Sequence, residues 1–168
     1  RTQVLVLQHA SEASHALNTA RLAALGLRNA ELRVGERFED DCDAARPSYL
    51  LFPGEDAIPL GSLADAAQPV RLIVPDGTWR KARKILHVNP WLAELPRVAL
   101  PEGLSSRYRL RKAPMPGALS TIEAIVTALN LLESPSRFDE LLRPFDALIE
   151  GQIDAMGREV YQRNHANT

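Results

Sequence analysis

The chain has 168 residues, enough for one domain with a substantial core and too few for two domains of ordinary size. Apolar residues make up 45% and charged residues 24%, proportions that exclude a disordered or fibrous protein. No apolar run approaches the roughly 20 residues of a membrane-spanning helix, and no signal-peptide pattern opens the sequence. A single cysteine, Cys42, excludes an internal disulfide and a thiolate-rich metal site, so we expect a cytoplasmic protein without membrane contact.

The formal net charge of −1 conceals an uneven distribution. Residues 71–112 carry ten Lys and Arg side chains against three acidic ones, a net of +7, whereas the rest of the chain carries a net of −8. A basic middle suggests a polyanionic partner such as nucleic acid. Alternatively, these charges pair with the acidic flanks or solvate a helix face, and charge alone does not decide between the two.

The hydrophobic pattern predicts alternating strands and helices. In chain order we expect a strand at residues 4–7, a helix at 11–26, strands at 32–34, 49–52 and 71–74, a helix at 79–87, a strand at 97–100, an exposed loop at 103–118, and helices at 121–132 and 136–163. Ser11 is a suitable N-cap for the first helix, and Ser120 with Glu123 forms a capping box for the third. Pro144 and Gly151 are expected to interrupt the last helix.

This alternation predicts an α/β fold, a mostly parallel sheet flanked by helices. In such sheets, ligands bind beyond the carboxyl ends of the strands. Three segments meet that description: residues 53–56, residues 75–79 and the loop that leads into residues 119–121. We therefore expect the functional site where these segments converge.

Asp76-Gly77-Thr78-Trp79 lies between a predicted buried strand and the basic helix at residues 79–87. Asp76 in this place could act as a general base, accept a hydrogen bond from a ligand ammonium, or cap the helix. Capping is the commonest role for such residues, with Thr78 as the other candidate and Trp79 then packed in the core. The pattern alone leaves these interpretations open.

Polar side chains also gather around the start of the first predicted helix. Glu12, His15 and Asn18 follow His9 at spacings of three, which place side chains on one helical face. Catalytic zinc usually takes three protein ligands, and the HExxH order is absent. We interpret the group as a polar surface facing the site, and we expect no metal.

Residues 107–112 interleave four cations with Tyr108, a composition that can contact phosphates and stack a base. A solvated basic loop is equally compatible with it. The GxGxxG, Walker A, GxSxG and CxxC motifs are absent, so dinucleotide, nucleoside triphosphate and triad hydrolase functions lack their usual anchors.

Five segments follow one another in an order shared with a known family. They are His9-Ala10-Ser11-Glu12 with His15 and Asn18-Thr19, Phe52-Pro53-Gly54-Glu55-Asp56-Ala57, Asp76-Gly77-Thr78-Trp79, Tyr108-Arg109-Leu110-Arg111 and Leu119-Ser120-Thr121-Ile122-Glu123-Ala124. Together, over about residues 3–130, they resemble the DTW-domain family of tRNA-uridine aminocarboxypropyltransferases. Ala10 stands where the family usually has Pro, and Ala20 where it usually has Gly. Members usually carry a cysteine-rich segment before the first strand, and we expect that such a segment preceded Arg1.

The resemblance implies one catalytic domain over residues 1–168, with a fold related to the SPOUT methyltransferases and a knotted C-terminal part. It also implies S-adenosylmethionine as the donor substrate and tRNA as the partner. The 3-amino-3-carboxypropyl group would move to N3 of a uridine, and methylthioadenosine would leave. Two other functions stay open: a SPOUT-type RNA methyltransferase using the same donor, and a non-catalytic RNA-binding module.

The resemblance also assigns residues, with Asp76 essential as either the base or a ligand of the donor ammonium. The donor is expected to contact Leu51, Phe52, Pro53, Gly54, Val74, Pro75, Thr78, Leu119, Ser120 and Thr121, largely through backbone groups. The tRNA is expected to contact Arg80, Lys81, Arg83, Lys84, Arg107, Tyr108, Arg109, Arg111 and Lys112. In-line displacement needs no metal, and the oligomeric state is left open because no self-complementary face is evident.

Overall fold

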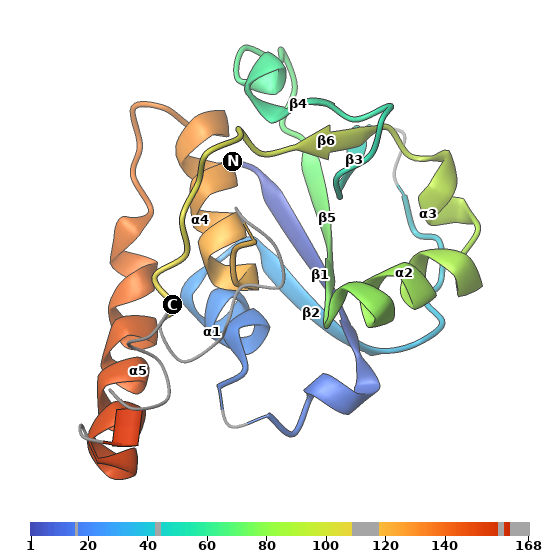
Figure 1. Cartoon of the computed structure of the whole chain (residues 1–168). Helices are drawn as coiled ribbons and strands as arrows, with labels where there is room; N and C mark the ends of the chain where they lie inside the picture. The colour runs from blue at the N-terminus through green and yellow to red at the C-terminus, as the bar shows by residue number, and fades with distance from the viewer. Residues whose placement is uncertain (16, 43–44, 109–117, 158–159, 162–168) are drawn as a thin grey trace.

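The protein is built around a six-stranded, all-parallel sheet, described here from a computed structural model (Figure 1). The structure describes residues 1–15, 17–42, 45–108, 118–157 and 160–161. The strands are β1 (Gln3–His9), β2 (Ala30–Gly35), β3 (Ser48–Leu51), β4 (Ile58–Pro59), β5 (Arg71–Asp76) and β6 (Arg97–Ala99). Their order across the sheet is β2-β1-β5-β3-β6-β4, so the predicted α/β fold with a parallel sheet is confirmed.

Helices cover both faces of the sheet (Figure 1). One face carries α1 (Thr19–Gly26), α4 (Thr121–Leu132) and α5 (Leu142–Met156), and the other carries α2 (Trp79–Val88) and α3 (Trp91–Glu94). Side chains alternate between the faces along each central strand. On β1, Val4 and Val6 join the core beneath α4, whereas Leu5 and Leu7 join the core beneath α2. Burial on both faces explains why the central strands are continuously apolar.

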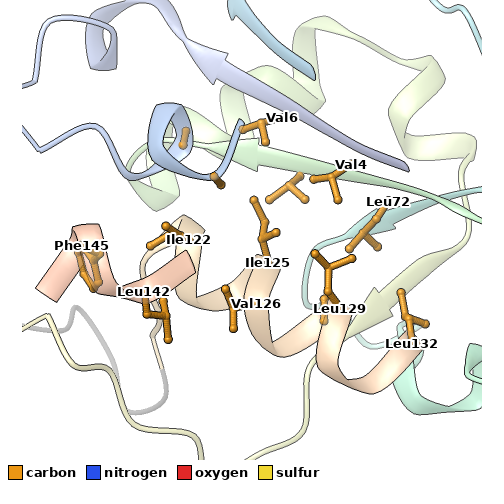
Figure 2. Packing of buried hydrophobic residues seen from close by; sticks show 14 of the residues in the cluster. Val4, Val6, Leu72, Ile122, Ile125, Val126, Leu129, Leu132, Leu142 and Phe145 are labelled. Atoms are coloured by element: carbon orange, nitrogen blue, oxygen red, sulfur yellow. The ribbon is translucent and has the colours of Figure 1, made fainter. Parts of the chain in front are cut away.

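The larger core lies between the sheet and α4. Figure 2 shows the apolar side chains of α4 directed toward Val4, Val6 and Leu72 of the sheet. Leu142 and Phe145 of α5 pack beside the first turn of α4 (Figure 2). The predicted capping box forms at that turn and fixes where α4 begins.

Two predicted helix boundaries were wrong. The first helix begins at Thr19 rather than after Ser11, because the Asn18 side chain accepts a hydrogen bond from the Arg21 amide (2.9 Å) and caps it there. Residues 10–12 form only a short 3-10 turn.

The last helix begins at Leu142 and continues through Pro144 and Gly151 without a break. Pro144 sits in the first turn, where a missing N–H removes no intrahelical bond. The helix ends at Gly157, whose φ of +86° suits glycine.

The short β4 and α3 were not predicted, because two and four residues carry too little periodicity. Across the described ranges, none of the helices combines the length and apolar character that crossing a bilayer requires.

The connections that follow β1 and β5 determine where the site lies. These neighbouring strands lie side by side in parallel, yet β1 leads to α1 on one face and β5 leads to α2 on the other. A crevice opens where adjacent connections diverge in this way, beyond the carboxyl ends of the strands.

Candidate active site

A cleft with a volume of about 990 Å³ occupies that position, a volume typical of sites for small organic ligands. Its wall includes the carboxyl-terminal parts of four strands, represented by Gln8 of β1, Leu51 of β3, Asp76 of β5 and Ala99 of β6. The N-cap residues of α2 and α4, Thr78 and Ser120, complete the wall.

Asp76 is the buried carboxylate of this wall, with only 8% of its surface exposed. Gln8 faces it across the β1–β5 ladder and donates a hydrogen bond from Nε2 to Oδ2 (2.8 Å). The Thr121 hydroxyl donates to the other oxygen, Oδ1. Each Asp76 oxygen therefore accepts one bond from the protein, and the two donors come from different elements, β1 and α4.

Gln8 is itself held by a second amide. Its Nε2 donates to Asn18 Oδ1 (2.9 Å), and Asn18 Nδ2 donates back to Gln8 Oε1 (3.0 Å). This reciprocal pair fixes which end of the Gln8 amide faces Asp76, and Asn18 Oδ1 also caps α1. Gln8 was not among the residues predicted from the sequence. The available signal was a polar residue directly after the buried run at residues 4–7, which is the same position that Asp76 takes after its own strand.

The turn from β5 into α2 explains why glycine follows Asp76. Gly77 has φ of +148°, and a Cβ on it would lie 3.0 Å from Lys81 Cβ. Thr78 caps α2, since its side chain accepts from the Lys81 amide (3.3 Å). Thr78 is thus the N-cap of α2, and Asp76 is instead part of the cleft wall.

Glu123 fastens the loop before residue 109 to the start of α4. This carboxylate is 5% exposed and accepts hydrogen bonds from the Ser120 amide (2.9 Å), the Ser106 hydroxyl (2.7 Å) and the Arg107 amide (2.5 Å). The sequence analysis assigned Glu123 only to the capping box. Its further bonds close one side of the cleft, where Ser106 and Tyr108 contribute to the wall.

Most residues expected to contact the donor meet in this one cleft. They are Leu51, Phe52, Pro53, Val74, Pro75, Thr78, Leu119, Ser120 and Thr121. Gly54 does not line the cleft but packs outside it, where a Cβ would lie 2.8 Å from Arg97 Nη1 and 2.9 Å from Asp56 Oδ1.

The aromatic rings of Phe52, Trp79 and Tyr108 line the cleft, and each packs against another ring. Trp79 makes an edge contact with Phe52 (centroids 5.5 Å apart), and Tyr108 makes one with Phe145 (5.4 Å). Trp79 and Tyr108 are both half-buried, so each of these rings has a packing role as well as an accessible part.

The basic residues that were expected to contact tRNA fall into two groups, those with an acidic partner and those without one in the described residues. Lys81 pairs with Glu12 (2.5 Å), Lys84 with Glu36 (2.8 Å), and Arg107 with Asp146 (3.5 Å). Arg80 and Arg83 are exposed and have no acidic partner in the described part of the chain. Arg109, Arg111 and Lys112 lie outside the described residues.

Arg71 and Arg97 belong to the basic middle of the sequence but also have acidic partners. Arg71 is buried and bonds Asp41 (2.9 Å), and Arg97 lies 3.7 Å from Asp56. Arg33, and to a lesser extent Arg71, lower the pKa of Asp41 to about 2. The net charge of residues 71–112 therefore overstates the free positive surface.

The polar group at residues 9–18 is dispersed among separate partners. His9 Nε2 lies 3.0 Å from Glu36, and Asn18 bonds Gln8. Glu12 holds Lys81, with His15 Nε2 at 3.7 Å from its other oxygen. Among the residues whose placement is described, no group of three His, Cys, Asp or Glu side chains is arranged to hold a metal ion.

A family model, the DTW domain, matches residues 1–153. The chain belongs to the DTW-domain family. It is 35% identical over 164 residues to a protein named tRNA-uridine aminocarboxypropyltransferase 2 from Drosophila melanogaster, covering 91% of this chain and 65% of that one. Proteins of the same name from Macaca fascicularis and Mus musculus are 32% and 33% identical, with 90% of this chain and 55% of each relative covered. The DTW chain thus spans between half and two thirds of the length of these relatives, and no solved structure matches it.

Proposed function

We propose that this DTW domain transfers the 3-amino-3-carboxypropyl group of S-adenosylmethionine to N3 of a uridine in tRNA. The names of its relatives state such a transfer for those proteins. The observation that carries the proposal is the buried Asp76, held by donors from β1 and α4 in the wall of a cleft at the strand ends. Ligands of parallel α/β sheets bind in this position.

The cleft residues fit the chemical groups of the donor. A volume of about 990 Å³ is sufficient for a nucleoside with an amino-acid arm. Phe52, Trp79 and Leu100 offer apolar wall for the nucleoside. Asp76 offers a carboxylate for the ammonium of the arm, and the positive ends of α2 and α4 suit its carboxylate.

The reaction is a displacement at the carbon next to the sulfonium. The bound donor supplies that electrophilic carbon; the N3–carbon bond forms as the carbon–sulfur bond breaks, and the N3 proton is released. The protein must direct this carbon, rather than the methyl group, toward N3. We assign Asp76 to the donor ammonium rather than to the N3 proton, because both of its oxygens already accept hydrogen bonds and it lies deep in the wall.

The tRNA would approach the cleft along α2, whose N-cap Thr78 and first residue Trp79 belong to the wall. In this proposal the target uridine is unpaired or flipped, because N3 is the atom that base pairing occupies. The SPOUT-like knot in the C-terminal part and the cytoplasmic location belong to the same proposal. The knot rests on the family resemblance, and the location rests on the presence of a single cysteine in the sequence.

Labelled donors test the transferred group. The DTW domain is incubated with unmodified tRNA and donor labelled in the carboxyl carbon, and in parallel with donor labelled in the methyl carbon. We expect the carboxyl label alone to enter tRNA. Methyl label in tRNA would support an RNA methyltransferase instead, and tRNA binding without transfer of either label would support a non-catalytic module.

A further inference from the structure

The basic helix α2 presents its cations on two different faces. Ala82 and Ile85 are buried against the sheet. At 100° per residue, Arg80, Arg83 and His87 project from the opposite side, and all three are exposed. Lys81 projects from the flank between these two faces, whereas Lys84 is exposed and projects from the edge of the outer side, about 40° from Arg80 around the helix axis.

Lys81 and Lys84 each form an ion pair within the protein. Lys81 reaches Glu12, which follows β1, and Lys84 reaches Glu36, which follows β2. Lys84, and to a lesser extent His9, lower the pKa of Glu36. These two pairs attach α2 to the loops at the carboxyl ends of two strands, so each lysine charge has a carboxylate beside it.

Arg80 and Arg83 differ from the two lysines in their partners. Of the seven Lys and Arg residues that residues 71–108 contain, Arg80 and Arg83 are the two without an acidic partner in the described residues. They are three positions apart, so their side chains lie side by side. Guanidinium groups suit phosphate better than ammonium groups do, because their planar donors bind two oxygens at once.

Arg80 and Arg83 also lie close to the cleft along the chain. Thr78 and Trp79, which directly precede Arg80, both line the wall that contains Asp76. A strand whose phosphates lie along the outer face of α2 therefore passes the mouth of the cleft at the amino end of the helix.

We propose that the outer row of α2, Arg80 and Arg83, binds the RNA phosphate backbone, whereas Lys81 and Lys84 are positioning residues that hold the loops after β1 and β2. This inference rests on the proposed function for the identity of the RNA as tRNA. It separates four cations that the sequence analysis treated as one group.

Two charge-matched double variants test the separation. Arg80→Gln/Arg83→Gln and Lys81→Gln/Lys84→Gln each remove two positive charges from the same helix. tRNA affinity is measured at several salt concentrations, with circular dichroism to establish that each variant is folded. We expect the arginine variant to bind about tenfold more weakly at low salt and to reduce the slope of log affinity against log salt by about 1.5.

The lysine variant should stay within about threefold of the unmodified protein, with an unchanged salt slope. Equal losses of slope in both variants would overturn the proposal, because the helix would then act only through its total charge. An unchanged slope in the arginine variant would overturn it as well. Because a variant could misfold, Arg80→Lys/Arg83→Lys is included, and it should keep the slope while losing a few-fold in affinity.

Two further experiments distinguish a failure of this proposal from a failure of the proposed function. Polyglutamate of matched charge should not displace tRNA at equal charge concentration; effective displacement would assign the row to acidic protein surfaces instead. The labelled-donor assay runs in parallel on the unmodified protein. A failed transfer with the expected difference in salt slope would refute the enzyme but retain the RNA-binding row.

Discussion

The two faces of the sheet are covered by different kinds of interaction. Beneath α1, α4 and α5 the described residues form a cluster of nineteen buried apolar side chains, whereas beneath α2 and α3 the cluster has six. The α2 side adds the ion pairs from Lys81 and Lys84 to acids beyond the strand ends. The first face supplies most of the buried apolar area and hence the stability. The second has the smaller apolar cluster and adds charged contacts to it.

Asp76 lies where these two regions meet, so its substitution gives the largest expected effect. Asp76→Asn keeps the size of the side chain but removes the charge that we assign to the donor ammonium. We expect transfer to fall about 100- to 1,000-fold, comparable with the loss of one electrostatic group in other active sites. The measurement is the initial rate with saturating tRNA.

Asp56→Asn is the matched control for that experiment, because Asp56 is largely exposed and outside the cleft. It should retain nearly the full rate. An Asp76→Asn variant that is as active as this control would remove Asp76 from the reaction.

The difference in packing can be measured with two matched isoleucines, both 0% exposed. Ile125 of α4 belongs to the larger cluster and Ile85 of α2 to the smaller one. Ile125→Ala should lower the free energy of unfolding by about 4 kcal/mol and Ile85→Ala by about 2 kcal/mol, because the less enclosed site relaxes more easily. Urea denaturation measures both values. Equal losses would show that the two faces contribute alike.

Substitution of Gln8, which pairs with Asn18 and holds Asp76, is expected to have a smaller effect on the reaction. Gln8→Met nearly conserves volume but removes the donor to Asp76 Oδ2 and the partner of Asn18. We expect about a tenfold rise in KM for the donor with a smaller change in kcat, since the carboxylate is then oriented by Thr121 alone. A merely structural role would lower stability without this division between KM and kcat.

Gln3→Met, at the amino end of the same strand and far from the cleft wall, is the control. It should leave KM unchanged. A similar KM in the Gln8 and Gln3 variants would contradict the positioning of Asp76 by Gln8.

The smallest effect concerns Asp41, whose pKa is lowered to about 2 by Arg33 and Arg71. A carboxyl with a lowered pKa in the folded state adds stability above its ordinary value near 4, and loses that contribution as the pH falls toward 2. Because Asp41 is 42% exposed, solvent screens the pair, and Asp41→Asn should cost at most about 1 kcal/mol at pH 7. Urea denaturation at pH 7 and pH 2.5 should show this difference shrinking, whereas Glu39→Gln should show none at either pH.

The sequence predicted the parts of this molecule that depend on local pattern. The buried strands, the basic helix at residues 79–88 and the capping box at Ser120 all follow from apolar runs or capping chemistry. The predicted start of α1 was wrong because Ser11 was expected to cap the helix, whereas Asn18 caps it in the packed structure.

The site was predictable in location but not in its internal contacts. The rule for parallel sheets predicted that residues 53–56, residues 75–79 and the loop into residues 119–121 would meet at the site. Pro53, residues 75–79 and residues 119–121 do line the cleft, whereas residues 54–56 do not. The bond from Gln8 to Asp76 depends on the register of β1 against β5, which no local pattern contains. The same holds for Lys81 and Lys84, whose acidic partners lie 69 and 48 residues away along the chain.

The central claim is that Asp76 binds the amino-acid arm of the donor, and calorimetry tests it most directly. S-adenosylmethionine and methylthioadenosine, which lacks that arm, are titrated into the unmodified protein and into Asp76→Asn. We predict that Asp76→Asn weakens binding of S-adenosylmethionine at least tenfold and leaves binding of methylthioadenosine within about twofold. Equal weakening of both ligands, or unchanged binding of S-adenosylmethionine, would contradict the account.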